Sequence, residues 1–263
     1  MADMQDLAVE SRSVADRLRD VALDPSKNLV SQVFEILKDM IVAITLKPGE
    51  LISEKEVAEA LGASKTPVRE AIIRLEDMGL VEVVPKSGTY VTPIQLDRYI
   101  EACFIRLQLE TGAVRRAAER KGGFEGIIRL EACIRAQEDM LAAEKRVEFF
   151  RLDETFHRLL FEIAGIPGVW NVLNQSKAEL DRIRHMKRIH KISRATEVVE
   201  EHKMIAKAVR DHDPDAAERA LIEHLGSLDG EIDKLSSHPK ILESIDQLNA
   251  FEVRRRSRGN TRA

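Results

Sequence analysis

The sequence lacks an apolar run of the roughly 18 residues that a membrane-spanning helix needs. Its first residues, MADMQDLAVESRSV, also lack the charged-then-apolar order of a secretory signal. Cysteine is scarce: Cys103 and Cys133 are the only two cysteines in the chain, and both stand among apolar residues at helical spacing. We therefore expect a cytoplasmic protein without a membrane anchor, whose cysteines are reduced core residues rather than a redox switch.

An excess of positive charge is missing as well, because the formal net charge is -4 at pH 7. The 263 residues suffice for two domains, each with its own core. From Leu29 to Thr92 the chain holds seven Lys or Arg against ten Asp or Glu. Binding to nucleic acid would therefore depend on where the basic side chains lie rather than on their total.

The segment 53–92 has the pattern of two short helices joined by a turn. Ser53 followed three residues later by Glu56 forms a capping box that predicts a helix start, and Gly62 ends that helix. Thr66 followed by Pro67 predicts the start of a second helix, with the hydroxyl as its cap.

Two β-rich stretches follow, Leu80–Val84 and Thr89–Thr92, separated by Pro85-Lys86-Ser87-Gly88. This order predicts a β-hairpin after the second helix. The apolar spacing from Leu29 to Ile44 predicts a scaffold helix before the pair. Together these elements predict a winged helix-turn-helix.

Such a unit binds DNA because a helix fits the major groove and its first turn reaches bases and phosphates. The plain alternative is a small helical subdomain with solvated polar residues. The candidate DNA contacts are Lys55, Lys65, Thr66, Arg69 and Lys86, with Gly88 forming the tight turn of the wing. Because local charge is weak, we expect a homodimer that places two such faces on a palindromic DNA operator.

The stretch SEKEVAEALGASKTPVREAIIRLEDMGLVEVVPKSGTYV closely resembles the DNA-binding domain of GntR-family transcription regulators, with similarity from about Leu29 to Pro93. The resemblance implies a transcription regulator. One departure is Lys65, where the family usually has arginine; lysine lacks the planar bidentate contact to guanine, so the operator preference is expected to differ.

After Pro93 the sequence shows only helical periodicity, interrupted by short polar or glycine-containing breaks. Short connections imply antiparallel neighbours, so we expect a mostly α protein whose winged helix-turn-helix precedes an all-α bundle of six or seven helices. The expected helices are Gln95–Arg120, Gly126–Ala143, Val147–Ala164, Val169–Lys191, Thr196–Arg210 and Ala216–Leu235. The expected parts are a flexible arm (1–28), a DNA-binding domain (29–93), a helical domain (94–236) and a C-terminal extension with a basic tail (237–263).

Four residues of the helical domain could bind a metal. Asp153 and His157 are four residues apart and share one helical face, and His202 and His224 could converge on them from neighbouring helices. Three histidines and one aspartate suit a divalent transition metal such as Zn, with Ni, Mn or Co also compatible. Spacing alone is weak evidence, since a lone histidine is more often an interior or surface residue.

The pieces FIRLQLE, RLDETFHRLL, VVEEHKMIAKAV and DPDAAERALIEHL resemble the FCD-type effector-binding domain of the FadR branch of the GntR family. The resemblance, from about Ile94 to Leu235, implies that Asp153, His157, His202 and His224 form its metal site. The chain departs from many relatives at Ile166, where they have asparagine, so a helix cap is expected to be missing there.

Arg106 is the candidate effector contact. It precedes Glu110 by one helical turn, and an arginine beside a metal can hold a carboxylate through two hydrogen bonds. The plain alternative is an Arg106–Glu110 ion pair on a solvated face. Relatives carry an effector-contacting arginine in this segment, which favours the functional role and implies a small carboxylate effector.

Three functions remain to be compared. The first is a metabolite-responsive transcription regulator in which an organic acid near the metal modulates operator binding. The second is a metal-dependent hydrolase that carries a DNA-binding module, with Glu201 as a candidate base. A purely architectural DNA-binding protein would leave the Asp and His residues unexplained, so we expect a regulator and not an enzyme.

Overall fold

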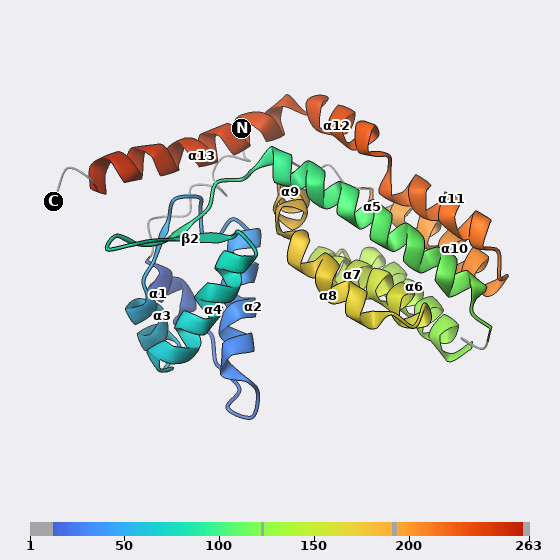
Figure 1. The fold of residues 1–263 in the computed structure, drawn as a ribbon, viewed down its shortest axis with the longest axis horizontal. Coiled ribbons are helices and arrows are strands. Elements are labelled where there is room, and N and C mark those ends of the chain that lie inside the picture. Colours follow the sequence, from blue (N-terminus) through green and yellow to red (C-terminus); the bar gives the residue numbers. More distant parts are fainter. Residues whose placement is uncertain (1–12, 122–123, 191–193, 260–263) are drawn as a thin grey trace. The chain divides into compact units, whose positions relative to one another are not determined.

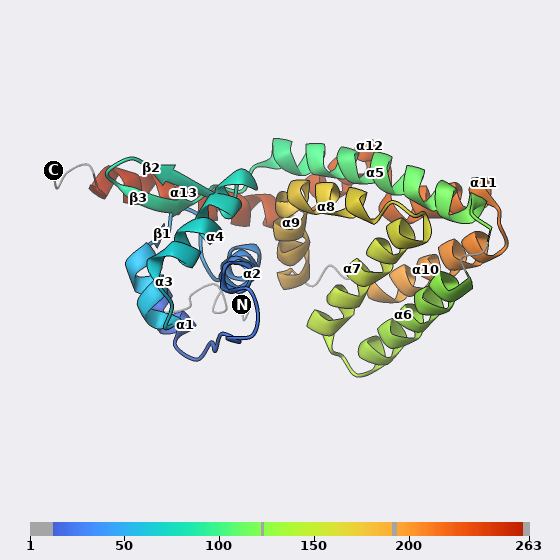
Figure 2. The same cartoon turned by 60° about the horizontal axis from the view of Figure 1, so that its bottom comes forward.

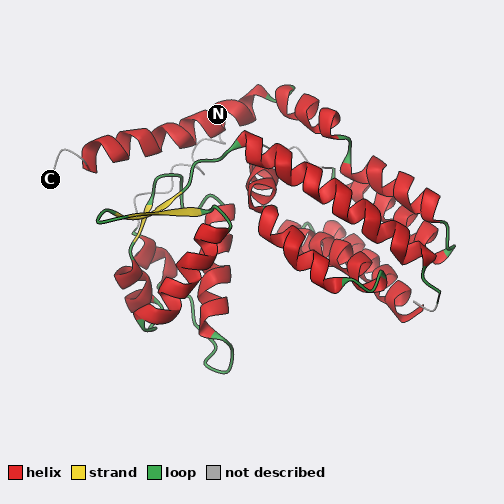
Figure 3. Ribbon diagram, in the orientation of Figure 1, coloured by secondary structure: helices red, strands yellow, loops and turns green. Residues whose placement is uncertain are grey.

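The computed structural model describes residues 13–121, 124–190 and 194–259, which are mostly helical with one small sheet (Figures 1 and 3). The described residues fall into two compact units. Of the described residues, the first unit contains 13–99, 178–190 and 238–259, and the second contains 100–121, 124–177 and 194–237. No helix among the described residues is long and apolar enough to cross a membrane.

The first unit contains the winged helix-turn-helix predicted from the sequence, which is confirmed. Helix α2 packs against α4 and against α9, and α1 packs against α3, around one apolar core. The elements of this unit are α1 (Val14–Leu18), α2 (Leu29–Val42), β1 (Leu51–Ile52), α3 (Glu54–Ala60), α4 (Lys65–Asp77), β2 (Val81–Val84), β3 (Gly88–Val91), α9 (Ala178–Ile189) and α13 (Pro239–Gly259).

The sheet is antiparallel with the order β1-β3-β2, so the predicted hairpin gains a third strand. Strand β1 was not expected, because two residues are too few to show an alternating pattern. At the hairpin turn Lys86 has φ 63° and Gly88 has φ 140°. The positive φ of Gly88 is a backbone conformation that other residues rarely adopt, so glycine is favoured there.

The start of the chain differs from the expected flexible arm. Residues 1–12 lie outside the described residues, but Ser13 caps α1 with a capping box, and Val14 and Leu18 are buried in the core. Arg17 in the same helix pairs with Glu50 at 3.0 Å. Within the stretch 1–28 that was expected to be an arm, residues 14–18 thus form a helix whose two apolar residues, one turn apart, pack in the core.

The two helices of the DNA-binding motif begin differently. Ser53 caps α3 as predicted, accepting a hydrogen bond from the backbone N–H of Glu56 at 3.3 Å. Helix α4 begins at Lys65 after Ser64, so the prediction that Thr66 caps it is wrong. Pro67 is tolerated in the first turn because the N–H groups there have no partner within the helix.

The second unit is the helical bundle predicted from the sequence. Helix α6 packs against both α7 and α10, and α10 packs against α11 (Figure 2). The helices are α5 (Leu96–Glu119), whose first residues belong to the first unit, α6 (Phe124–Ala142), α7 (Arg146–Ile163), α8 (Pro167–Ser176), α10 (Ala195–Arg210), α11 (Pro214–Leu225) and α12 (Leu228–Ser236).

Two of the long helices expected from the sequence are each divided into two. The stretch Val169–Lys191 breaks at Lys177 into α8 and α9, and Ala178 lies in the core of the first unit. The stretch Ala216–Leu235 breaks at Gly226, which has φ 83°, and Ser227 then caps α12. The second break follows from glycine and a hydroxyl cap.

The junction of α7 and α8 lacks a side-chain cap at Ile166, as expected from the departure at that position. Two arginines of α5 instead satisfy carbonyls at the end of α7. Arg116 donates to the carbonyl of Ala164 at 2.8 Å, and Arg120 donates to the carbonyl of Ile163 at 2.9 Å. Positive charge at a helix C-terminus is also favoured by the helix dipole.

The segment that leaves the wing, Thr92–Ile94, is held by side chains from α9 and α13. Arg182, which is fully buried, donates to the carbonyls of Thr92 at 3.0 Å and Pro93 at 3.2 Å. Asn249 donates to the carbonyl of Ile94 at 3.0 Å and accepts from its N–H at 2.9 Å. We call these contacts the linker clamp.

The linker clamp explains why contiguous domain boundaries do not describe the chain. Helix α9 was expected in the domain 94–236 and α13 in a separate extension, yet both belong to the compact unit of the winged helix-turn-helix. In α13 the inward residues Ile241, Ile245 and Leu248 are buried. The side chains of the basic tail lie outside the described residues.

Candidate metal centre

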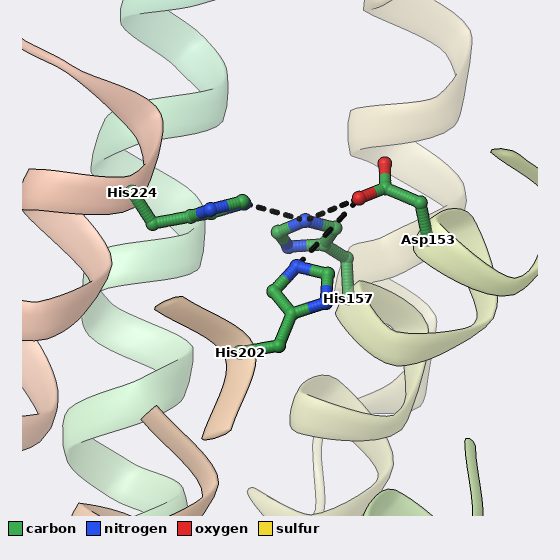
Figure 4. A group of neighbouring side chains, drawn as sticks. All are labelled: Asp153, His157, His202 and His224. Atoms are coloured by element: carbon green, nitrogen blue, oxygen red, sulfur yellow. Dashed lines mark hydrogen bonds and ion pairs between the residues drawn. The ribbon is translucent and has the colours of Figure 1, made fainter. Parts of the chain in front are cut away.

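Four side chains from three helices converge in the second unit (Figure 4). Helix α7 contributes Asp153 and His157, α10 contributes His202, and α11 contributes His224. Their exposed fractions are 4%, 1%, 0% and 6%. One ligand atom from each lies within 4.8 Å of the others, so the group could hold a metal ion.

The distances show which atoms face one another. Nε2 of His157 lies 3.2 Å from Nε2 of His224 and 3.9 Å from Oδ1 of Asp153. Nε2 of His202 lies 3.6 Å from the same Oδ1 and has no hydrogen-bond partner among the described residues. Three Nε2 atoms and one carboxylate oxygen therefore form the centre of the group.

Each imidazole has one acceptor at its other nitrogen. Nδ1 of His157 lies 2.6 Å from Oε2 of Glu110, and Nδ1 of His224 lies 2.8 Å from Oε2 of Glu201. Nδ1 of His202 lies 2.8 Å from Oε1 of Gln137. Carboxylate and amide oxygens accept hydrogen bonds, so Nδ1 of His202 and Nδ1 of His224 donate to them and their Nε2 atoms face inward. The contact of His157 with Glu110 is an ion-pair contact and not a hydrogen bond.

Arg106 joins this arrangement from α5. Its Nε donates to Oε1 of Glu110 at 2.7 Å, and its Nη2 donates to Nε2 of His157 at 2.8 Å. The Arg106–Glu110 ion pair considered from the sequence is present, but it is not on a solvated face, because Arg106 is 7% exposed and Glu110 is 1% exposed.

Burial and charge set the protonation of these groups. Burial lowers the pKa of His157 and lowers that of His202 well below the ordinary value, so both rings are neutral at pH 7. Burial alone would raise the pKa of Glu110, but Arg106 and His157 bring that pKa well below its usual range. Glu110 is therefore an ionised acceptor inside the bundle.

The donor set fits a divalent cation. Nε2 of His157 and Nε2 of His224 lie 3.2 Å apart, close enough for one cation to be held by both nitrogens. Two nitrogens that bind one Zn²⁺ tetrahedrally at about 2.0–2.1 Å each would lie about 3.3 Å apart. The oxygens of Glu110, Gln137 and Glu201 beside the Nδ1 atoms also suit a metal site, because such outer partners orient metal-binding histidines.

The outer acceptors were only partly visible in the sequence. Glu110 was considered as a partner of Arg106 and Glu201 as a catalytic base, but neither was linked to an imidazole. Gln137 was missed altogether. Its one signal is a polar residue on a helix face that also carries Leu130, Cys133 and Ile134, which are buried with it.

The candidate DNA contacts all lie in the first unit. The side chains of Lys55, Lys65, Thr66, Arg69 and Lys86 are exposed. Arg69 makes two hydrogen bonds to Glu54, from Nε at 3.2 Å and from Nη2 at 2.9 Å. Lys65 and Thr66 are in the first turn of α4, and Lys86 and Gly88 are at the tip of the wing.

The cysteines are both free. Cys133 is buried and donates to the carbonyl of Leu152 at 3.3 Å, and burial raises the pKa of its thiol to about 11. The expected core placement is confirmed for this residue, whereas Cys103 is half-buried.

Comparison with protein families gives two matches along the chain. The model of the FCD domain matches residues 101–227. The model described as bacterial regulatory proteins, gntR family, matches residues 29–91. The first range includes the four residues of the candidate metal centre, and the second includes the candidate DNA contacts.

Several regulators have similar sequences. The HTH-type transcriptional repressor RspR of Escherichia coli (strain K12) is 34% identical over 206 residues, which cover 78% of this chain and 90% of that protein. An uncharacterized HTH-type transcriptional regulator in an unstable DNA locus of Streptomyces ambofaciens is 33% identical over 211 residues, which cover 80% and 87%. The Nta operon transcriptional regulator of Aminobacter aminovorans is 27% identical over 186 residues, which cover 71% and 86%.

Solved structures share the fold. E. coli McbR/YncC has a TM-score of 0.66 at 22% identity and covers 81% of this chain and 99% of its own. A GntR-type transcriptional regulator from Rhodococcus sp. RHA1 has a TM-score of 0.59 at 22% identity, with 81% and 97% covered. At these identities the similarity concerns the fold alone.

Proposed function

This chain belongs to the GntR family of bacterial regulatory proteins and carries an FCD domain, and we propose that a small organic acid bound beside a metal ion sets its affinity for DNA. The chain is a DNA-binding transcription regulator, as its resemblance to the family predicted. The observation that carries the proposal is the inward convergence of three Nε2 atoms, one carboxylate oxygen and the buried guanidinium of Arg106.

The DNA-binding end consists of exposed residues on α3, α4 and the wing. We assign base and phosphate contacts to Lys65, Thr66 and Arg69, and supporting phosphate contacts to Lys55 and Lys86. Because the local charge is weak, a homodimer would place two recognition helices on one palindromic operator. Since the operator is part of the bacterial chromosome, we place the protein in the cytoplasm.

The effector end is the candidate metal centre. A divalent cation such as Zn, Ni, Mn or Co, held by Asp153, His157, His202 and His224, would supply a Lewis-acidic site for a carboxylate oxygen. Arg106 adds hydrogen-bond donors on the same side, because its Nη2 already reaches Nε2 of His157. Glu110 fixes the guanidinium by accepting from Nε. Nη2 would turn to a carboxylate once a metal ion takes the His157 lone pair to which it now donates.

Switching requires that the acid bind two arrangements of the protein with different affinity. A coupling free energy of about 1–3 kcal/mol would change operator affinity by about 5- to 150-fold. That range is sufficient for a genetic switch.

The hydrolase considered from the sequence is not supported. The relatives with similar sequences are named as transcription regulators. Glu201, the candidate base, has Oε2 at 2.8 Å from Nδ1 of His224, and its Oε1 accepts from Arg194. Both carboxylate oxygens are thus engaged, so we assign Glu201 to the orientation of His224.

The test is a thermal-shift screen of the zinc-loaded protein against small mono-, di- and tricarboxylic acids, each paired with its uncharged amide. We expect at least one acid, and not its amide, to raise the unfolding midpoint, because a ligand of the native state stabilises it by mass action. That acid should also change operator affinity in a gel shift at fixed salt. A screen in which no acid acts, or acids act equally on metal-free protein, contradicts the proposal.

A further inference from the structure

Among the described residues, Gln137 on α6 is the one neutral acceptor beside the Nδ1 atoms of the three imidazoles. Its side chain is fully buried, and its Oε1 lies 2.8 Å from Nδ1 of His202. We propose that Gln137 is a positioning residue that holds His202 as the Nδ1–H tautomer and aims Nε2 at the metal. The proposal rests on the proposed function for the metal, but its tautomer part stands without metal.

The first step concerns the proton. An amide oxygen can only accept a hydrogen bond, so the contact with Gln137 places a proton on Nδ1 of His202. The lone pair of the neutral ring is then on Nε2, the atom that lies 3.6 Å from Oδ1 of Asp153. Nε2 has no hydrogen-bond partner among the described residues, so the contact with Gln137 is the hydrogen bond that fixes the tautomer there.

The second step concerns the orientation of the ring. His202 stacks on Phe156, with ring centroids 3.7 Å apart and an interplanar angle of 12°. Stacking fixes the plane of the ring but not which edge faces the centre, because a half-turn about the Cβ–Cγ bond keeps the same plane. That half-turn would exchange Nε2 with a carbon. The hydrogen bond from Nδ1 to Gln137 is the contact that distinguishes the two orientations.

The third step concerns the cost of the residue. The amide nitrogen of Gln137 has no acceptor among the described residues, so burying this side chain is unfavourable where a leucine would pack. The amide also supplies an acceptor without charge, whereas the acceptors beside the other two imidazoles, Glu110 and Glu201, are carboxylates. A role in positioning His202 accounts for the burial of the costly amide group and for the use of an acceptor that carries no negative charge.

The direct experiment observes the tautomer in the full-length, metal-free protein. Histidine ¹⁵N–¹H correlation spectra, with His202 assigned from an H202N variant, should show the proton on Nδ1 in the wild type. Q137M keeps the length of the side chain and removes the acceptor, so we expect a mixture of tautomers. Q137M that keeps the wild-type tautomer overturns the proposal.

The second measurement is Zn²⁺ affinity by competition with a chelator. We expect Q137M to bind Zn²⁺ about 10–100-fold more weakly, as for other outer-sphere partners, and Q137E, which keeps an acceptor, to stay within about threefold of the wild type. Q108L, at an exposed glutamine of α5, is the matched control. Equal weakening in Q137E and Q137M, or wild-type affinity in Q137M, would refute the positioning role.

Folding and metal binding are kept separate in this design. If Q137M does not fold by near-ultraviolet circular dichroism, Q137L provides the same test with a branched side chain. A wild type that shows the Nδ1 proton but binds no Zn²⁺ overturns the proposed metal site and supports the tautomer assignment.

Discussion

At the scale of single residues, the protein places chemistry on side chains whose partners come from distant parts of the chain. His157 and Asp153 share one helix face, but His202 and His224 reach the same point only because α10 packs against α11. The outer acceptors extend the set to Glu110, Gln137 and Glu201. Removing one imidazole should therefore affect the metal more than the fold.

The first prediction concerns metal content. H157A and H202A should each lose most of the bound divalent metal, because either change removes one of four ligands. Elemental analysis after purification checks this. H238A changes a histidine of the first unit and should retain full metal content. Full occupancy in both H157A and H202A would show that the metal-site assignment is wrong.

The second prediction concerns Arg69 and its partner. R69A should weaken operator binding by about 1–3 kcal/mol, the range for a base or phosphate contact, and leave the bundle folded. E54Q weakens the hydrogen bonds of 2.9 Å and 3.2 Å that Arg69 makes to Glu54. Arg69 is then easier to bring to the DNA, so operator affinity should be unchanged or higher than in the wild type. Gel shifts at fixed salt measure both. Unchanged binding by R69A would exclude the recognition-helix assignment.

At the scale of elements, the linker clamp is the feature that helical periodicity does not reveal. The backbone groups of Thr92–Ile94 take part in no helix, and the carbonyls are satisfied by Arg182 and Asn249. Glu179 also accepts from the backbone of Gln95 and pairs with Arg182 at 3.1 Å. Unpaired backbone groups in a buried segment would be costly, so these side chains stabilise the connection.

The third prediction concerns Asn249. N249A removes both hydrogen bonds to Ile94 and should lower the free energy of unfolding by about 1–3 kcal/mol, the cost of leaving buried backbone groups unpaired. Urea unfolding followed by circular dichroism measures this. Q247A, at an exposed position of the same helix, should change stability by less than about 0.5 kcal/mol. Equal effects of the two changes would mean that the clamp contributes nothing specific.

Prediction from sequence succeeded where local rules determine the structure. The cap at Ser53 and the hairpin turn before Gly88 depend on residues that are neighbours in sequence, whereas the missing cap at Ile166 was expected from the departure from the family. The break at Lys177 was not predictable in this way, because no glycine or proline marks it. It depends on tertiary packing, which places Ala178 in the core of the first unit.

The residues of the candidate metal centre also differ in how far the sequence could predict them. Asp153 and His157 follow from helical spacing, whereas joining them to His202 and His224 depended on the family resemblance. Helical periodicity could place Gln137 on the buried face of α6 but could not identify its partner, because His202 is 65 residues away. The register between α6 and α10 decides that contact.

At the scale of the whole molecule, metal and acid should act together. The chain is a regulator of the GntR family, and the proposed effector contact, Arg106, donates to one of the candidate ligands, His157. Metal binding should therefore stabilise the native state and create the site at which an acid acts. Linkage requires that an acid that changes DNA affinity is itself bound differently in the presence of DNA.

The fourth prediction tests this dependence. Removing metal with a chelator should lower the unfolding midpoint and abolish any shift caused by the acid found in the screen, because only a native-state ligand stabilises. R106Q should retain metal content and lose the acid-dependent shift. An acid-dependent shift that persists in metal-free protein or in R106Q would assign the acid to another site.

The division of the chain into two units has a consequence for how the family's parts can be exchanged. The backbone passes between the units four times, at residues 99–100, 177–178, 192–193 and 237–238. A chimaera that joins residues 1–93 to the effector domain of a relative would lose the native α9 and α13, and with them Arg182 and Asn249. A chimaera that combines this DNA-binding unit with another effector-binding domain would therefore need all three segments of the first unit, and not the N-terminal segment alone.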